Sequence, residues 1–156
     1  ENQVNKIEAG FYYPVIPDSI AVSNQEYYEY KSEQAIFKGA LKDGEPDGVW
    51  CVFNVAGKLL GQFPYGDGKI DGVAPFFYEN GDLLAQVTYK NGVIAGYKEF
   101  FPDGTLRTEI VYRKGVRHGT AKFYYNTGHL FCEGRYKNGR QTGKWRYYKV
   151  TGEKLY

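Results

Sequence analysis

Hydrophobic and polar residues alternate with a period of two through much of this 156-residue chain. Segment 130–136 reads L-F-C-E-G-R-Y, which places leucine, cysteine, glycine and tyrosine on one side and phenylalanine, glutamate and arginine on the other. Segments 106–112 and 83–89 show the same alternation. A period of two is that of a β-strand, and glycine or proline interrupts the chain too often for long helices. The pattern predicts strands whose leucine-to-tyrosine side faces inward.

An eight-residue segment with glycine at its fourth and eighth positions recurs along the chain. Its first glycines lie at positions 44, 68, 92, 115 and 139, so the spacing is 24, 24, 23 and 24 residues. The segment occurs once per repeat and is always followed by another apparent strand, so we interpret its glycines as turn positions and not as a phosphate-binding loop. The octets are LKDGEPDG (41–48), YGDGKIDG (65–72), YKNGVIAG (89–96), YRKGVRHG (112–119) and YKNGRQTG (136–143).

A second turn signal lies between the octets and reads VAG, ENG, PDG or NTG, with leucine two residues later and tyrosine six residues after that. Each unit therefore reads strand, short turn, strand, longer turn. The array predicts an all-β fold: an elongated single-layer antiparallel β-meander built from hairpin repeats of about 24 residues. One unit is a residue shorter, GYKEFFPDG against GTAKFYYNTG, and we expect a turn to absorb the difference.

The repeats divide the chain into a non-repeat segment at 1–24 and a repeat array at 25–156. Degenerate units are expected at both ends, because terminal units must stop the stacking. The predicted units are a degenerate first one at 25–47, full ones at 48–71, 72–95, 96–118 and 119–142, and a truncated last one at 143–156.

Aromatic residues recur at two adjacent positions of the first strands. We expect one set to face inward: Trp50, Phe76, Phe100, Phe123 and Tyr147. The other set forms a ladder that is a candidate docking strip for a protein partner, or else stacks on itself and closes the edges of the sheet. This ladder comprises Phe53, Phe77, Phe101, Tyr124 and Tyr148.

The cysteines, Cys51 and Cys132, fall in units about seven strands apart. At the usual strand spacing that separation is roughly 30 Å or more, which is beyond disulfide reach. We predict two free thiols.

Charge is distributed unevenly along the chain. Residues 1–78 carry 11 acids and 6 bases, whereas residues 79–156 carry 7 acids and 14 bases. The basic half could attract an acidic partner or could simply be a solvated face with edge-strand lysines. No apolar run is long enough to predict a membrane-spanning helix. The chain begins ENQVNK without an initiator methionine, from which we expect a removed upstream segment; we favour an export signal and a periplasmic location over the cytoplasm.

The segments E-G-R-Y-K-N-G-R-Q-T-G (133–143) and Y-R-K-G-V-R-H-G (112–119) resemble a MORN repeat (membrane occupation and recognition nexus). Tyrosine in place of tryptophan, together with the (F/Y)-Y-x-x-G-x-L segment, is similar to the bacterial variant found in YwqK-type antitoxins. The resemblance covers residues 25–156 and implies an interaction module, with toxin neutralisation as its particular form. Choline- or glucan-binding repeats fit less well because tryptophan occurs only at Trp50 and Trp145. The YD repeats of toxin shells need many more units.

The sequence offers no catalytic constellation, so we predict a protein that is not an enzyme and has no cofactor or metal. His118 and His129 each lack a second ligand at metal spacing. Aspartates in the first octets are typical of turn capping, with calcium binding as the lesser alternative.

Three functions remain open on these grounds. The first is binding of a protein partner, the second is association with an anionic membrane or polyanion, and the third is head-to-tail self-association of the acidic and basic ends. Nucleic acid is the less favoured polyanion. Besides the aromatic ladder, the candidate partner-binding residues are Arg113, Arg117, Arg140 and Arg146.

Overall fold

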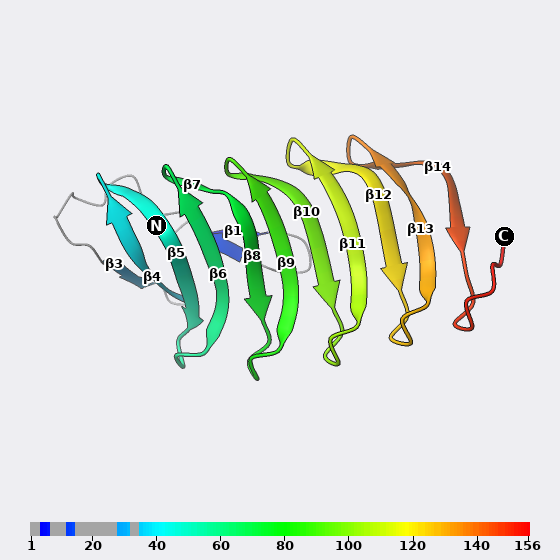
Figure 1. Ribbon diagram of the computed structural model, residues 1–156, viewed down its shortest axis with the longest axis horizontal. Coiled ribbons are helices and arrows are strands. Elements are labelled where there is room, and N and C mark those ends of the chain that lie inside the picture. Colours follow the sequence, from blue (N-terminus) through cyan, green and yellow to red (C-terminus); the bar gives the residue numbers. More distant parts are fainter. Residues whose placement is uncertain (1–3, 7–11, 15–27, 32–34) are drawn as a thin grey trace. The chain divides into compact units, whose positions relative to one another are not determined.

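Figure 1 shows the computed structural model, which describes residues 4–6, 12–14, 28–31 and 35–156. Every regular element in these residues is a β-strand, and none of them forms a helix that could cross a membrane. The chain divides into two compact units, residues 1–69 and 70–156. Most of the predicted non-repeat segment lies outside the described residues.

Unit 1 contains two antiparallel arrangements. Strands β1 and β2 pair with each other, while the remaining strands form a meander in the order β6-β5-β4-β3. The division between the units falls within the two-residue strand β7. The strands are β1 (Val4–Lys6), β2 (Tyr12–Pro14), β3 (Tyr28–Lys31), β4 (Ala35–Lys42), β5 (Glu45–Asn54), β6 (Leu59–Gly66) and β7 (Lys69–Ile70).

Unit 2 is an antiparallel meander in which each strand pairs with its sequence neighbours, as Figure 1 shows. The octets form the short turns on one edge, and the G-x-L segments form the longer turns on the other. The prediction of an all-β antiparallel meander of hairpins is confirmed. The strands are β8 (Gly72–Phe77), β9 (Leu83–Lys90), β10 (Val93–Phe100), β11 (Leu106–Arg113), β12 (Val116–Tyr124), β13 (Leu130–Lys137) and β14 (Arg140–Tyr147).

Each octet turn places two consecutive residues at positive φ, which is the conformation of a two-residue type I′ hairpin turn. Asn138 and Gly139, for example, have φ values of 50° and 82°. The octet glycines are therefore turn residues, as expected. The residue before the first glycine is Asp, Asn or, in the fourth octet, Lys114.

One face of the sheet is apolar, and in each unit an indole ring on this face packs directly on a glycine of the neighbouring strand. In unit 1, Trp50 is fully buried, and its ring covers Gly39 so closely that a Cβ there would lie 2.3 Å from it. Trp145 covers Gly134 in unit 2 in the same way. Other buried residues on this face of unit 2 include Ala74, Val87, Tyr97, Ile110 and Ala121. The leucine-to-tyrosine side of the second strands lies on this face: Thr108, Ile110 and Tyr112 are buried in β11, and Cys132 and Tyr136 in β13.

The prediction of which aromatic residues face inward was only partly correct. Trp50 and Phe76 are buried, and Phe123 and Tyr147 are half-buried. In β10, however, Glu99 pairs with Thr108, the residue that Phe123 faces from the other side. Glu99 therefore occupies the inward position that was assigned to Phe100.

One repeat is a residue shorter than the others because its β-bulge contains one residue fewer. The prediction that a turn absorbs this difference was wrong. The long turns have equal length, because the Phe101 N–H bonds the Thr105 carbonyl and the Tyr125 N–H bonds the His129 carbonyl, both at 2.8 Å. Between β9 and β10, by contrast, only Ala95 is inserted in the register. The corresponding bulge of β12 sets residues 118–120 against Val111 of β11, so it contains two extra residues where the bulge of β10 contains one.

Both cysteines are free thiols, as predicted. Cys132 is buried on the apolar face, and this burial raises the pKa of its thiol. Cys51 is half-buried, with the Gln62 amide nitrogen 3.8 Å from its sulfur.

Candidate functional site

The opposite face of unit 2 carries a row of charges that alternates in sign from strand to strand. We call it the charge row: Lys98, Glu109, Lys122, Glu133 and Arg146. Each member lies directly opposite the next in the strand register. The Lys98 Nζ is 3.6 Å from the Glu109 carboxylate, and the Arg146 guanidinium is 3.4 Å from Glu133. Opposite charges in directly opposed positions stabilise a sheet, so the row joins five adjacent strands.

Glu133 connects the charge row to the aromatic side chains of this face. Its Oε1 accepts a 2.8 Å hydrogen bond from the Tyr148 hydroxyl in addition to the contact with Arg146. This hydrogen bond is the main reason that the pKa of Tyr148 is raised. Burial, followed by the charges of Glu109 and Glu133, raises the pKa of Tyr124. Both tyrosines therefore lie beside the acids of the row.

All five residues of the predicted aromatic ladder are half-buried. In unit 1, the Lys38 Nζ lies 5.6 Å from the centre of the Phe53 ring. Phe77, Tyr124 and Tyr148 occupy equivalent places at the ends of their strands. Phe101 does not, because the short bulge moves Phe100 into the ladder and leaves Phe101 in the following turn.

Tyrosines at the start of the long turns tie one hairpin to the next. The Tyr78 hydroxyl donates to the Phe100 carbonyl at 3.1 Å, and the Tyr125 hydroxyl donates to the Tyr148 carbonyl at 2.9 Å. Phe101 is the equivalent residue of the intervening repeat, where the Arg107 guanidinium lies 5.5 Å from the ring centre. Sequence reasoning missed these ties; their signal was the aromatic residue that recurs at the start of three successive long turns, at Tyr78, Phe101 and Tyr125.

The four predicted arginines do not form one patch. Arg146 belongs to the charge row, whereas Arg117 stacks on the ring of Tyr136 with 5.2 Å between guanidinium and ring centre. Arg140 is exposed at the start of β14. Arg113 lies at the octet-turn edge.

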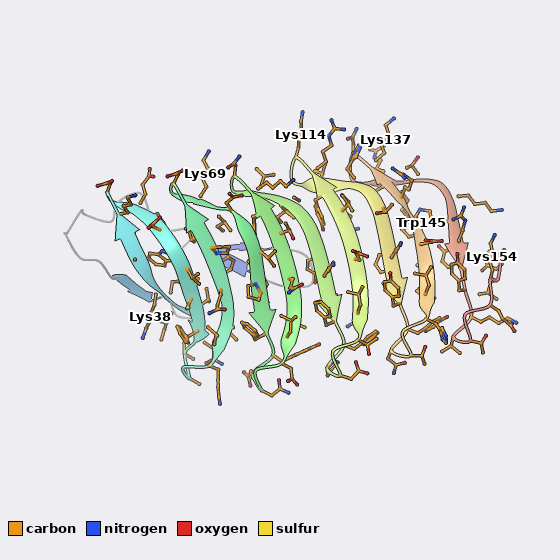
Figure 2. The ribbon with its side chains drawn as sticks, viewed as in Figure 1. Lys38, Lys69, Lys114, Lys137, Trp145 and Lys154 are labelled. Atoms are coloured by element: carbon orange, nitrogen blue, oxygen red, sulfur yellow. The ribbon has the colours of Figure 1, made fainter. Side chains whose placement is uncertain are left out.

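At that edge of unit 2, Arg113 and its neighbours line an open cavity of about 380 Å³. Figure 2 shows Lys114 and Lys137 projecting from this edge. The two turns that bound the cavity are joined, because Asn138 donates its N–H to His118 Nδ1 at 3.3 Å and Gly139 donates to the Arg117 carbonyl at 2.8 Å. The lining residues are Arg113, Lys114, Val116, His118, Lys137 and Asn138.

Acidic residues line a smaller cavity in unit 1, of about 140 Å³, which includes Asp43, Glu45, Asp47 and Asp67. In the part of the chain that the structure describes, no three His, Cys, Asp or Glu side chains are grouped to hold a metal ion. His129 is engaged near the C-terminus, where its Nδ1 lies 2.9 Å from the Val150 carbonyl.

An aromatic cluster near the C-terminus was not expected from the sequence. Phe131 is 42% exposed on the same side as the charge row. Its ring centre lies 5.3 Å from that of Tyr125 and 6.2 Å from that of Tyr147, and Tyr147 in turn lies 5.9 Å from Tyr156. The signal in the sequence was Phe131 itself, an aromatic residue on the polar side of a predicted strand.

These features define a protein built from antiparallel hairpin repeats, with an apolar face, a charge row and two turn edges. In agreement, two segments, residues 70–91 and 117–138, match the family model described as MORN repeat variant. The first segment contains β8, the long turn and β9, and the second contains nearly all of β12, the next long turn and β13; both end in the octet turn that follows. No curated protein sequence matched the chain.

Several solved structures are similar to part of the chain. They include TarM, at 13% identity over 70% of this chain with a TM-score of 0.47, and the accessory secretory proteins 1, 2 and 3 of Streptococcus pneumoniae, at 13% over 66% with a TM-score of 0.41. The Gap123 glycosylation-associated complex of Streptococcus agalactiae matches at 17% over 69%, with a TM-score of 0.41. This chain covers 21%, 20% and 20% of those chains, respectively, about a fifth of their length.

Proposed function

We propose that this chain is a non-catalytic protein-interaction module whose partner docks on the face that carries the charge row. The observation that supports this most directly is the half-buried aromatic set beside the row. Aromatic rings that are surrounded by paired charges resemble the anchors and polar rim of protein interfaces. Tyr124 and Tyr148 are the central residues of this surface, since both lie next to Glu133.

The test is affinity capture from native cells with the wild-type chain and with a Tyr124→Ala/Tyr148→Ala variant. We expect a partner that the wild-type chain retains and the variant loses. An Arg113→Ala variant, altered at the octet-turn edge, is the matched control and retains the partner. If the wild-type protein elutes alone at monomer size, or if the double variant keeps the partner, this proposal is wrong.

A toxin-neutralising role is the specific form of this function that the resemblance to YwqK-type antitoxins suggests. The partner would then be a protein whose expression alone stops growth. Co-expression with the product of the neighbouring gene tests this: growth restored by the wild-type chain and not by the tyrosine double variant supports it.

A second candidate is binding of an anionic membrane surface or another polyanion at the octet-turn edge of unit 2. The cavity lined by Arg113, Lys114 and Lys137 favours this alternative, because three cations and His118 converge there. Binding to vesicles that contain phosphatidylserine should be abolished by Arg113→Glu/Lys137→Glu and should weaken steeply with salt. Equal binding by the two proteins would exclude this site.

A further inference from the structure

The seventh octet residue joins two pairs of octet turns in unit 2. Asp71 occupies this position in the second octet, and its Oδ1 accepts the Asn91 N–H of the next octet turn at 3.3 Å. His118 occupies it in the fourth octet, and its Nδ1 accepts the Asn138 N–H at 3.3 Å. The imidazole therefore makes the contact that a carboxylate makes elsewhere in the array. This contact requires an unprotonated Nδ1, because a protonated imidazole has two donors and no acceptor.

Protonation of His118 would open the contact without separating the two turns. The Gly139 N–H still donates to the Arg117 carbonyl at 2.8 Å, and this backbone bond does not involve the imidazole. Protonation thus frees one backbone N–H and creates one charged donor at the same place. Both belong to residues that line the cavity of about 380 Å³ at the octet-turn edge, His118 and Asn138.

The charged residues that share this cavity with His118 are all basic. Arg113 comes from β11, Lys114 from the turn that follows it, and Lys137 from β13. Figure 2 shows the two lysines projecting from this edge. Among the described residues, none of these three cations forms an ion pair. Their charges are therefore free to attract an anion.

No acid on the surrounding strands competes for the cavity. Strands β11 to β14 contain only Glu109 and Glu133, and both lie in the charge row, 3.6 Å and 3.4 Å from their cations. The other charged groups near His118 are basic: Arg117 stacks on a tyrosine ring, and Arg140 is exposed at the start of β14. The ligand that suits this cavity is therefore an anion.

We propose that this cavity binds the phosphate group of a ligand and binds it more tightly when His118 is protonated. The phosphate oxygens can then accept both the imidazolium N–H and the freed Asn138 N–H, beside the three cations. Since histidine is the side chain that ordinarily changes charge between about pH 5 and 8, affinity should rise as the pH falls through this range. This inference rests on the second candidate function proposed above and specifies the group recognised and its regulation.

Sulfate is the first probe, because it has the tetrahedral shape of phosphate and keeps its charge across this pH range. It is titrated into the full isotope-labelled chain at about pH 5.5 and about pH 8, with sodium chloride of equal ionic strength as the reference. Amide NMR shifts report the site and the affinity. The test variant is His118→Asn, whose side-chain oxygen can still accept the Asn138 N–H but does not titrate. His129→Asn is the matched control, because His129 is the other histidine of the chain and lies at a long turn.

We expect sulfate to shift the amide signals of Lys114, His118 and Asn138 in the wild-type chain and in the His129→Asn control. Both proteins should bind it at least about fivefold more tightly at the lower pH, whereas His118→Asn should bind weakly and equally at both. Equal affinity of the wild-type chain at the two pH values, pH dependence that persists in His118→Asn or is lost in the control, or shifts no larger than those in chloride would each overturn the proposal.

Glycerol 3-phosphate and vesicles that contain phosphatidic acid present the same phosphate group free and at a membrane. Binding of the free ester identifies a soluble ligand, binding of the vesicles alone identifies a lipid head group, and binding of neither overturns the proposal. If these tests fail but phosphatidylserine vesicles still bind through Arg113 and Lys137, only this inference fails; if those vesicles do not bind, the second candidate function fails as well. The partner-docking function is tested separately, through Tyr124 and Tyr148.

Discussion

The octet turns show how single residues control the local geometry. A non-glycine residue at positive φ is strained unless it is Asn or Asp, whose short polar side chains tolerate that region. Asp43, Asp67, Asn91 and Asn138 meet this requirement, whereas Lys114 adopts φ 51° without such a side chain. The fourth octet therefore contains a turn with avoidable strain.

Lys114→Asn should stabilise the protein by about 0.5–1 kcal/mol, because asparagine relieves the strain at this position. Urea unfolding of the two proteins measures the difference. Lys137→Asn is the control, since Lys137 precedes the turn and is not at positive φ. An equal gain in both variants would show that loss of positive charge, and not turn geometry, is responsible.

Phe101→Tyr should add the hairpin tie that the intervening repeat lacks. The new hydroxyl is expected to donate to the Tyr124 carbonyl, as Tyr125 donates to that of Tyr148. A hydrogen bond of this type contributes about 0.5–1.5 kcal/mol. Tyr125→Phe should lose a similar amount. Thermal unfolding of both variants measures these changes, and a destabilised Phe101→Tyr variant would contradict the assignment of equivalent positions.

At the scale of the strand, close packing of tryptophan on glycine fixes how β14 lies on β13. The Trp145 ring occupies the space that a side chain at position 134 would need. Gly134 is in an ordinary strand conformation. Glycine is therefore needed at this position because it has no side chain, and not because of its backbone freedom. The equivalent pair of Gly39 and Trp50 shows that the arrangement is repeated in unit 1.

Gly134→Ala should therefore destabilise the protein by about 1–3 kcal/mol through steric overlap with the indole ring. The cost should be largely absent in a Trp145→Ala background, as a double-mutant cycle by urea unfolding would show. Gly66→Ala is the matched control, because no atom lies within 4 Å of a Cβ built there. A cost that persists without Trp145 would mean that the strand cannot accept alanine for another reason.

At the scale of the whole molecule, the sequence predicted the hairpin repeats, the turn glycines, the apolar side of the second strands and both free thiols. These follow from short-range patterns that repeat. The bulges could not be read in this way, because whether the chain inserts one or two extra residues depends on how the strand pairs with its neighbour. The one-residue error at Ala95 misplaced both Phe100 and Phe101.

The arrangement of the candidate binding residues was predicted only in part for the same reason. The four candidate arginines have different surroundings in the folded sheet. Arg113 lines the cavity at the octet-turn edge, and Arg117 stacks on the ring of Tyr136. Arg140 is exposed at the start of β14, and Arg146 belongs to the charge row. The charge row itself is formed by residues that alternate in sign only when neighbouring strands are aligned. Lys122 lies between Glu109 and Glu133 once that register is known.

Lys122→Glu would place three acids in adjacent positions of the row. We expect it to lower the free energy of unfolding by about 1–2 kcal/mol, since two favourable pairs become unfavourable, and 1 M salt should recover much of the loss. Urea unfolding at low and high salt measures this. Lys144→Glu, at an exposed site outside the row, should have little effect; an equal loss there would argue against a role for the row.

The charge row has a further consequence for how such a chain can change length during evolution. The two complete hairpins of the row, β10–β11 and β12–β13, each contribute one cation from the first strand and one acid from the second, as Lys122 and Glu133 illustrate. Duplication or deletion of a whole hairpin therefore leaves every cation next to an acid. Gain or loss of a single strand would instead bring like charges together, so the row favours growth of the protein by complete repeats.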